Sequence, residues 1–336
     1  MKRIVWVSMA MVGLLWIFVN IGFTAELKKV IILSSRSAES MPEYVLKGLA
    51  EAGFEEQRNL TGMQMLVLGN TDPAQIVAQV KEAAPDVVVN TSEFGHVVAA
   101  VKELSLSIIT VNGVERDVNP EGVPTANVTG IYSNLPDFVY NSYKFLQKVA
   151  PLKPGQQAVF LDIPEVALIP KADVVEALQR LEIPLKAVVD ATIYEDWQQA
   201  VLQYNDDPEV GWILRGTGPM RKRDGSPVDI FTEMFPWERE HLKKPMVTYW
   251  ETTVRDGALC GFGLDLDVLG EQAGRMAARV LRGEPIQSIK AEYPQKVSIS
   301  LNRKTATNLG IVFSLDVLNL ANVIYDDYEG KQVIRK

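Results

Sequence analysis

The chain has 336 residues, of which 47% are hydrophobic and 23% charged, and its formal net charge at pH 7 is −8. This length suffices for two domains, and the composition is that of a globular protein. An acidic chain without a basic cluster is not expected to bind nucleic acid or an anionic membrane surface, and the single cysteine, Cys260, excludes an intramolecular disulfide.

The first 25 residues form a distinct segment. Lys2 and Arg3 precede an uncharged apolar stretch, residues 4–25, which is typical of an export signal that is cleaved after Ala25. Phe23 departs from the small-residue cleavage pattern, and the stretch is nearly long enough to span a membrane. Cleavage and retention as an N-terminal anchor therefore both stay open. Either one predicts a periplasmic or extracytoplasmic body.

From Lys28 onward, short β-rich runs alternate with helical stretches, which predicts a parallel α/β architecture. The first set has expected strands at residues 30–34, 63–69, 86–90, 106–112 and 127–133, with helices at 41–52, from 73 onward and at 93–103. The second set has expected strands at 157–163, 185–191, 211–216 and 246–251, with helices at 136–149, 172–181 and 194–204.

Residues 257–322 contain a Gly-punctuated strand, a long helix ending at Arg282-Gly283, a further strand and two short helices. This segment is too short for a third domain, so we expect it to complete both sets. The predicted fold class is α/β, with two doubly wound parallel-sheet lobes joined by crossover hinge segments. The expected bounds are 26–134 plus about 252–286 for lobe 1, and 135–251 plus about 287–336 for lobe 2. Open parallel sheets bind ligands at the carboxyl ends of their strands, so a ligand is expected between the lobes.

Several short motifs follow one another with a characteristic order and spacing: Gly48-Leu49-Ala50-Glu51-Ala52-Gly53, Pro85-Asp86-Val87-Val88-Val89, Asn127-Val128-Thr129-Gly130-Ile131, Lys244-Pro245-Met246-Val247, Leu281-Arg282-Gly283-Glu284-Pro285 and Leu309-Gly310-Ile311. In these the chain resembles the ABC-transporter substrate-binding protein family, which has the periplasmic-binding-protein type I fold and includes tryptophan- and tyrosine-type receptors. The resemblance implies a monomeric receptor that binds a small polar or amphipathic molecule between its lobes and presents it to an ABC permease.

The chain departs from this family in two places. Where the family commonly has an Asp-Pro pair, this chain has Val111-Asn112-Gly113, and residues 219–243 form an aromatic, charged excursion. An aromatic amino-acid ligand is therefore not implied. A ligand-sensing module for a membrane kinase is the alternative function.

Polar and aromatic residues at the ends of the expected strands are the candidate ligand contacts. They are Ser35, Arg36, Asn90, Thr91, Ser92, Asn112 and Gly113 in the first lobe, and Asp162, Arg215, Thr217, Trp250 and Glu251 in the second. Each has a structural alternative. The small polar residues also suit helix caps and turns, Arg215 needs either an acidic partner or a ligand anion, and Glu251 could pair with Arg255 four residues on.

Motifs of catalysis and metal binding are missing from the sequence. It has two histidines and no HExxH, paired CxxC, GxSxG or P-loop pattern. We therefore expect no cofactor, no metal and no enzymatic activity. The rival reading is an extracytoplasmic enzyme in which Asp162 or Glu251 serves as acid or base.

Overall fold

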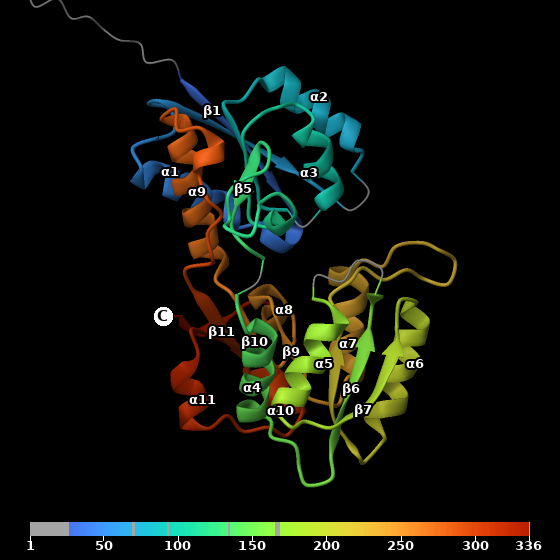
Figure 1. Cartoon of the computed structure of the whole chain (residues 1–336). Coiled ribbons are helices and arrows are strands. Elements are labelled where there is room, and N and C mark those ends of the chain that lie inside the picture. The colour runs from blue at the N-terminus through green and yellow to red at the C-terminus, as the bar shows by residue number, and fades with distance from the viewer. Residues whose placement is uncertain (1–26, 69–70, 93, 134, 165–168, 336) are drawn as a thin grey trace, which may run out of the picture.

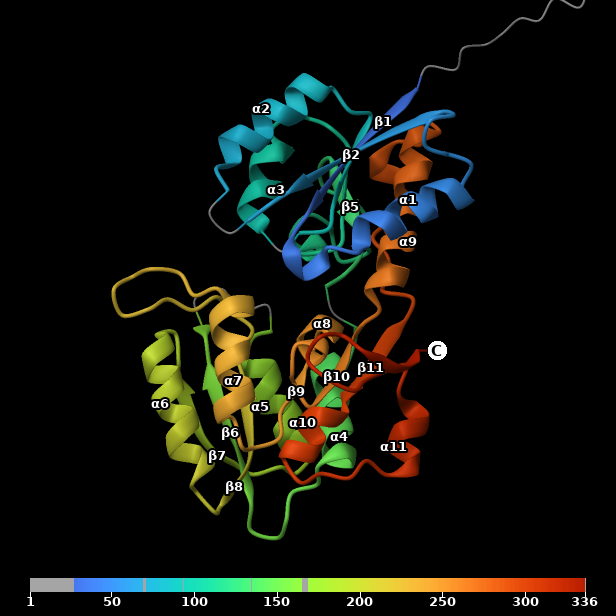
Figure 2. The same cartoon turned by 180° about the vertical axis from the view of Figure 1, so that it is seen from behind.

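The computed structural model describes residues 27–335 except 69–70, 93, 134 and 165–168, and it forms two lobes (Figure 1). The first lobe contains the N-terminal strands and helices together with helix α9, and the second contains the remaining strands and helices (Figures 1 and 2). The predicted α/β fold class with two lobes is confirmed. The expected export signal or anchor at residues 1–25 lies outside the described residues.

The first lobe is built on a five-stranded parallel sheet in the order β2-β1-β3-β4-β5. Its strands are β1 (Lys28–Ser34), β2 (Leu60–Leu66), β3 (Val87–Asn90), β4 (Ile108–Thr110) and β5 (Val128–Gly130). The central strands consist mainly of β-branched and aliphatic residues that are buried on both faces, as expected for a sheet covered by helices on both sides. The second strand begins earlier than predicted, because Leu60 already pairs with Lys28.

Helices cover both faces of this sheet. One face packs against α1 (Met41–Glu51) and α9 (Leu266–Leu281), and the other against α2 (Pro73–Ala83) and α3 (Gly95–Lys102). Helices α1 and α9 approach closely because both carry glycine at the contact: a Cβ atom on Gly274 would lie 2.2 Å from the carbonyl oxygen of Val45. Asp72 caps α2, and its carboxylate accepts a hydrogen bond from the backbone N–H of Ala74 at 2.9 Å.

The second lobe contains a three-stranded parallel sheet in the order β7-β6-β8. Its strands are β6 (Gln157–Asp162), β7 (Leu185–Asp190) and β8 (Val210–Arg215). The helices around it are α4 (Phe138–Val149), α5 (Lys171–Arg180), α6 (Tyr194–Asn205) and α7 (Phe235–His241), and α7 is preceded by a π-helical turn η4 (Ile230–Met234). About half of the excursion at residues 219–243 therefore becomes helix that packs on this sheet.

A second sheet in the same lobe has the order β13-β12-β11-β10-β9. Its strands are β9 (Val247–Thr248), β10 (Cys260–Leu264), β11 (Val297–Asn302), β12 (Val323–Tyr325) and β13 (Gln332–Arg335). This sheet is mixed, since β10 pairs antiparallel with β11 and β12 antiparallel with β13. Three short helices accompany it, α8 (Glu251–Arg255), α10 (Arg303–Asn308) and α11 (Leu315–Leu320).

The strand predicted at residues 246–251 is shorter in the structure. Only Val247 and Thr248 pair with β10, and Trp250 precedes the first turn of α8. Trp250 and Glu251 therefore begin a helix instead of ending a strand.

The chain passes between the lobes after Ile131, between β10 and α9, and before β11. The last two passages lie side by side, with the Nζ of Lys296 3.0 Å from a carboxylate oxygen of Asp265. The rings of Tyr132 and Tyr293 are in contact next to them, with centroids 4.7 Å apart and planes tilted by 31°. These contacts join the segments that we expected to act as a hinge.

The division of the chain into lobes remains a proposal, but strand pairing favours a change in its bounds. The prediction placed residues 252–286 with the first lobe, yet β10 pairs with β9 and β11 of the second. Conversely, Glu292 bridges to Ile131 at the end of the first sheet. We therefore propose that about residues 266–293 complete the first lobe.

Among the described residues, no helix has the length and apolar character needed to cross a membrane.

Candidate functional site

The carboxyl ends of the two parallel sheets face each other. Strand β1 runs toward the second lobe, and the arrowheads of β6 and β7 point toward the first (Figure 1). Two ion pairs cross between the lobes here. Arg36 lies 3.7 Å from Asp229, and Arg255 lies 3.6 Å from Glu39. The strand ends that we expected to bind a ligand therefore lie at the junction of the lobes.

A small pocket lies at this junction and is lined from both lobes. The first lobe contributes Asn112 and Ser133, and the second contributes Phe138, Ile169, Thr217, Tyr249, Trp250 and Leu264. Its interior volume of about 20 Å³ is enough for roughly one water molecule. A metabolite would need these side chains to move apart, which movement of the lobes would allow. We call these eight residues the interlobe pocket.

Three of the predicted contacts line the interlobe pocket: Asn112, Thr217 and Trp250. The Nδ2 of Asn112 donates to the carbonyl oxygen of Ser92 at 3.2 Å, and the Oγ1 of Thr217 accepts from the backbone N–H of Ile169 at 3.0 Å. The other lining residues did not appear among the candidates. A sequence signal existed only for Tyr249, which is adjacent to Trp250, and for Ser133, which is the last residue of an expected strand.

The polar residues after β3 bond to one another and to the backbone. The side-chain oxygen of Asn90 accepts from the hydroxyl of Ser92 at 2.7 Å, and its nitrogen donates to the hydroxyl of Thr110 at 3.1 Å. The hydroxyl of Thr91 donates to the carbonyl oxygen of Leu33 at 3.0 Å. All of these side chains are buried. They fix the shape of the loop, and a ligand role for Asn90, Thr91 and Ser92 stays a prediction.

Two further candidates of the first lobe lie near the junction. Ser35 is buried, whereas Arg36 is exposed and pairs with Asp229 of the second lobe. Gly113 has a φ of 74°, a left-handed conformation that favours glycine, and its N–H donates to the hydroxyl of Ser133 at 2.8 Å. Gly113 therefore positions a side chain of the interlobe pocket without lining it.

Arg215 has an acidic partner in the structure. Its Nε lies 3.2 Å from the Oε1 of Glu238, its guanidinium lies over the ring of Phe235 at 5.6 Å from the centroid, and Met234 is also in contact. Among the described residues, neither Nε nor Oε1 has an aligned hydrogen bond, so the contact is mainly Coulombic. Burial raises the pKa of Glu238, and Arg215 partly offsets that rise. Of the two alternatives, the structure shows the acidic partner.

The two carboxylates proposed for the second lobe also have protein partners. The Asp162 side chain is buried and lies 3.8 Å from the Nζ of Lys171. Glu251 accepts hydrogen bonds from the hydroxyls of Tyr325 at 2.8 Å and Ser298 at 3.0 Å. The guanidinium of Arg255, the partner that the sequence suggested for Glu251, lies 3.2 Å from a carboxylate oxygen of Asp256 and 3.6 Å from one of Glu39.

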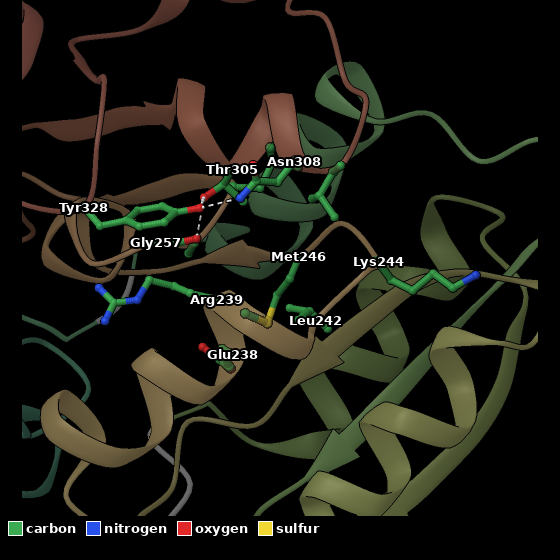
Figure 3. Close-up of a pocket in the computed structure, with 12 residues that line it drawn as sticks. Glu238, Arg239, Leu242, Lys244, Met246, Gly257, Thr305, Asn308 and Tyr328 are labelled. Carbon is green, nitrogen blue, oxygen red and sulfur yellow. Dashed lines mark hydrogen bonds between the residues drawn. The ribbon is translucent and has the colours of Figure 1, made fainter.

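A second pocket lies within the second lobe, between α7 and the segment around α10 (Figure 3). Its polar groups bond to each other: the hydroxyl of Thr305 donates to the carbonyl oxygen of Gly257 at 2.7 Å, and Asn308 donates to the hydroxyl of Tyr328 at 3.0 Å. Arg239 lies 5.3 Å from the centre of the Tyr328 ring. The interior volume of this pocket is about 30 Å³. We therefore interpret it as a small packing gap between α7 and the segment around α10.

Metal-binding groups are not evident. In the part of the chain that the structure describes, no group of three or more His, Cys, Asp or Glu side chains could hold an ion. The single cysteine, Cys260, is buried in β10, and burial raises the pKa of its thiol.

Two α/β lobes with facing strand ends and several chain crossings define the type I periplasmic binding fold. The model of a family described as ABC transporter substrate binding protein matches residues 229–324. The family resemblance predicted from the sequence is thereby confirmed for this segment. The match includes residues 229–243, part of the excursion that appeared to depart from the family. No curated protein matches the chain in sequence.

Solved structures share this fold over most of the chain. A conserved domain protein from Vibrio cholerae is 20% identical, with a TM-score of 0.66, over 90% of this chain and 100% of that one. The ABC domain in complex with L-Trp from Streptococcus pneumoniae is 20% identical, with a TM-score of 0.67, over 89% and 100%. A ligand-free, open substrate binding protein with adhesive properties from Clostridium difficile is 17% identical, with a TM-score of 0.61, over 89% and 100%.

Proposed function

We propose that this chain is the extracytoplasmic solute-binding protein of an ABC importer, and that it binds a small organic molecule in the interlobe pocket. The observation that carries the proposal is the lining of that pocket. Asn112 and Ser133 come from one lobe, whereas Thr217 and Trp250 come from the other. A solute that contacts both sets would bind the closed form more tightly than the open form.

The energetics of closure support this arrangement. A shift in the closed population from 1% to 99% requires about 5.5 kcal/mol of differential binding. Contacts from one lobe are equal in the open and closed forms and cannot supply it. Contacts from the second lobe, including the Trp250 ring, form only on closure and can supply this differential binding energy.

Titration calorimetry against a metabolite panel, combined with small-angle X-ray scattering, tests the proposal. A bound solute should lower the radius of gyration as the lobes close. Trp250→Ala should weaken binding at least tenfold, whereas Leu202→Ala, at an exposed position of α6 in the same lobe, should leave affinity unchanged. Binding without any contribution from Trp250 would contradict the proposed location.

The importer role needs a cellular assay. Deletion of the gene should abolish uptake of the solute that the purified protein binds, and the exported protein should begin at Glu26 if the signal is cleaved. Unchanged uptake despite tight binding would favour the sensor alternative.

We further propose that the solute is bound and released without chemical change and that the protein is a monomer. Mass spectrometry should recover the bound solute intact, and light scattering should give one chain's mass. Turnover of the solute would favour the enzyme rival, in which Asp162 or Glu251 is the catalytic group.

A further inference from the structure

The interlobe pocket has an uncharged, largely apolar lining. Phe138, Tyr249 and Trp250 supply rings, and Ile169 and Leu264 supply aliphatic surface. The rings of Phe138 and Tyr249 lie 5.7 Å apart at an angle of 38°, in a cluster that continues behind the pocket. Flat apolar surfaces of this kind favour a planar ligand that buries its faces.

The phenol of Tyr249 adds no charge to this lining. Its hydroxyl donates to the hydroxyl of Tyr143 at 3.0 Å, and both side chains are buried. Burial raises the pKa of both phenols, so both remain neutral at physiological pH.

The charged side chains proposed as ligand contacts have protein partners, and none of them lines the pocket. Each of the four charged candidates from the sequence has one: Arg36 pairs with Asp229, Asp162 with Lys171, Arg215 with Glu238, and Glu251 with two hydroxyls. The nearby carboxylate of Glu115 is exposed and accepts from the backbone N–H of Ser133 at 2.6 Å. Because the lining itself contains no charged side chain, a charged ligand group in the pocket would lose its hydration without a counter-charge in contact, which is costly.

One uncommitted acceptor lies on the first lobe. The Nδ2 of Asn112 approaches the carbonyl oxygens of Ser92 at 3.2 Å and Thr91 at 3.5 Å, and carbonyl oxygens only accept. This fixes the orientation of the amide, with Nδ2 toward the loop. In the described part of the chain, no hydrogen bond to the Oδ1 of Asn112 is found, so this oxygen can accept from a ligand.

One uncommitted donor lies on the second lobe. The Oγ1 of Thr217 accepts from the N–H of Ile169 at 3.0 Å, which leaves the hydroxyl hydrogen able to donate. A ligand with an N–H next to a C=O would bond to Asn112 and Thr217 at once and so connect the lobes.

We propose that the interlobe pocket selects an uncharged, planar heteroaromatic solute whose edge carries an N–H donor beside a C=O acceptor. This inference rests on the proposed function and adds the class of solute. It disfavours zwitterionic amino acids and organic acids, because both bring charges that the described lining does not match.

Calorimetry on the exported protein tests the inference with hypoxanthine as the neutral probe carrying that edge. Indole lacks the acceptor, and L-tryptophan and benzoate are charged. We expect hypoxanthine to bind at least tenfold more tightly than any of these three. Thr217→Val should lower hypoxanthine affinity by about tenfold and leave indole affinity unchanged. Thr61→Val, at an exposed position of β2, is the matched control.

The outcomes separate the two proposals. If L-tryptophan, benzoate or a sugar binds more tightly than hypoxanthine, the solute class is wrong while the receptor function stands. If neither these probes nor a broad metabolite panel binds, the receptor function fails as well. Should Thr217→Val lower the melting temperature, the ranking of hypoxanthine against indole on the unmodified protein still decides the question.

Discussion

Replacing Arg215 with methionine would keep most of the buried stem of this side chain and remove its positive charge. Glu238, which is 7% exposed, would then stay in α7 without the guanidinium whose Nε lies 3.2 Å away. Removing one member of a buried ion pair typically costs about 3–5 kcal/mol. Because the Arg215 side chain is 16% exposed, we expect a loss of about 3 kcal/mol at pH 7.5.

The loss should depend on pH in a defined direction. Burial raises the pKa of Glu238, and Arg215 lowers it part of the way back, so the pKa rises further in the variant. A carboxyl group whose pKa is higher in the folded state favours folding below its unfolded pKa and loses that contribution as pH rises through the folded value. The deficit of the variant should therefore be largest at pH 7.5 and smaller near pH 5.

Urea unfolding followed by tryptophan fluorescence at both pH values measures this deficit. The double variant Arg215→Met/Glu238→Gln should recover more than half of the lost stability, because no charge then remains buried. Arg223→Met is the control, since Arg223 pairs with Asp196 at the surface. If Arg215→Met unfolds at the same urea concentration as the unmodified protein and instead loses solute affinity, Arg215 serves the ligand and the reasoning from burial is refuted.

Three further changes test other parts of the structure. Gly274→Ala should cost about 1–3 kcal/mol in urea unfolding, because its Cβ would overlap the backbone of α1, whereas Gly95→Ala, with no atom within 4 Å, should cost little. Cys260 should react with a thiol reagent only after unfolding, since it is buried and burial raises its pKa. Neutralising Arg36 and Arg255 together should change solute affinity less than tenfold and reduce its dependence on salt, because exposed ion pairs are weak and screened.

Local patterns were enough to predict most elements of both lobes. Alternation of apolar strands with amphipathic helices set their order, and single capping residues such as Asp72 set helix starts. Pairing between distant segments was not visible in the same way. The antiparallel pairing of β10 with β11, which gives the second lobe its mixed sheet, depends on strands separated by the whole of α9.

Candidate site residues were harder to predict, because a polar residue at a strand end can either bind a ligand or form hydrogen bonds within its own loop. Asn90 has the chemistry to bind a ligand, but its loop folds back so that Ser92 and Thr110 satisfy its amide. The partner of Glu251 illustrates the same limit. Tyr325 lies 74 residues away in sequence, whereas the sequence offered Arg255 one helical turn away.

The buried polar network of the first lobe also bears on how the protein recognises its solute. Side chains such as Asn90 and Thr91 already have partners, so they hold the strand ends rigid without competing for the ligand. Under the proposed function, recognition would then depend on the few groups with spare hydrogen-bonding capacity, chiefly Asn112 on one lobe and Thr217 on the other. Because these two groups belong to different lobes, a solute satisfies both only when the lobes are closed. Loss of either one should therefore weaken closure as well as affinity, so Asn112→Ala should reduce the ligand-induced change in the radius of gyration at equal occupancy.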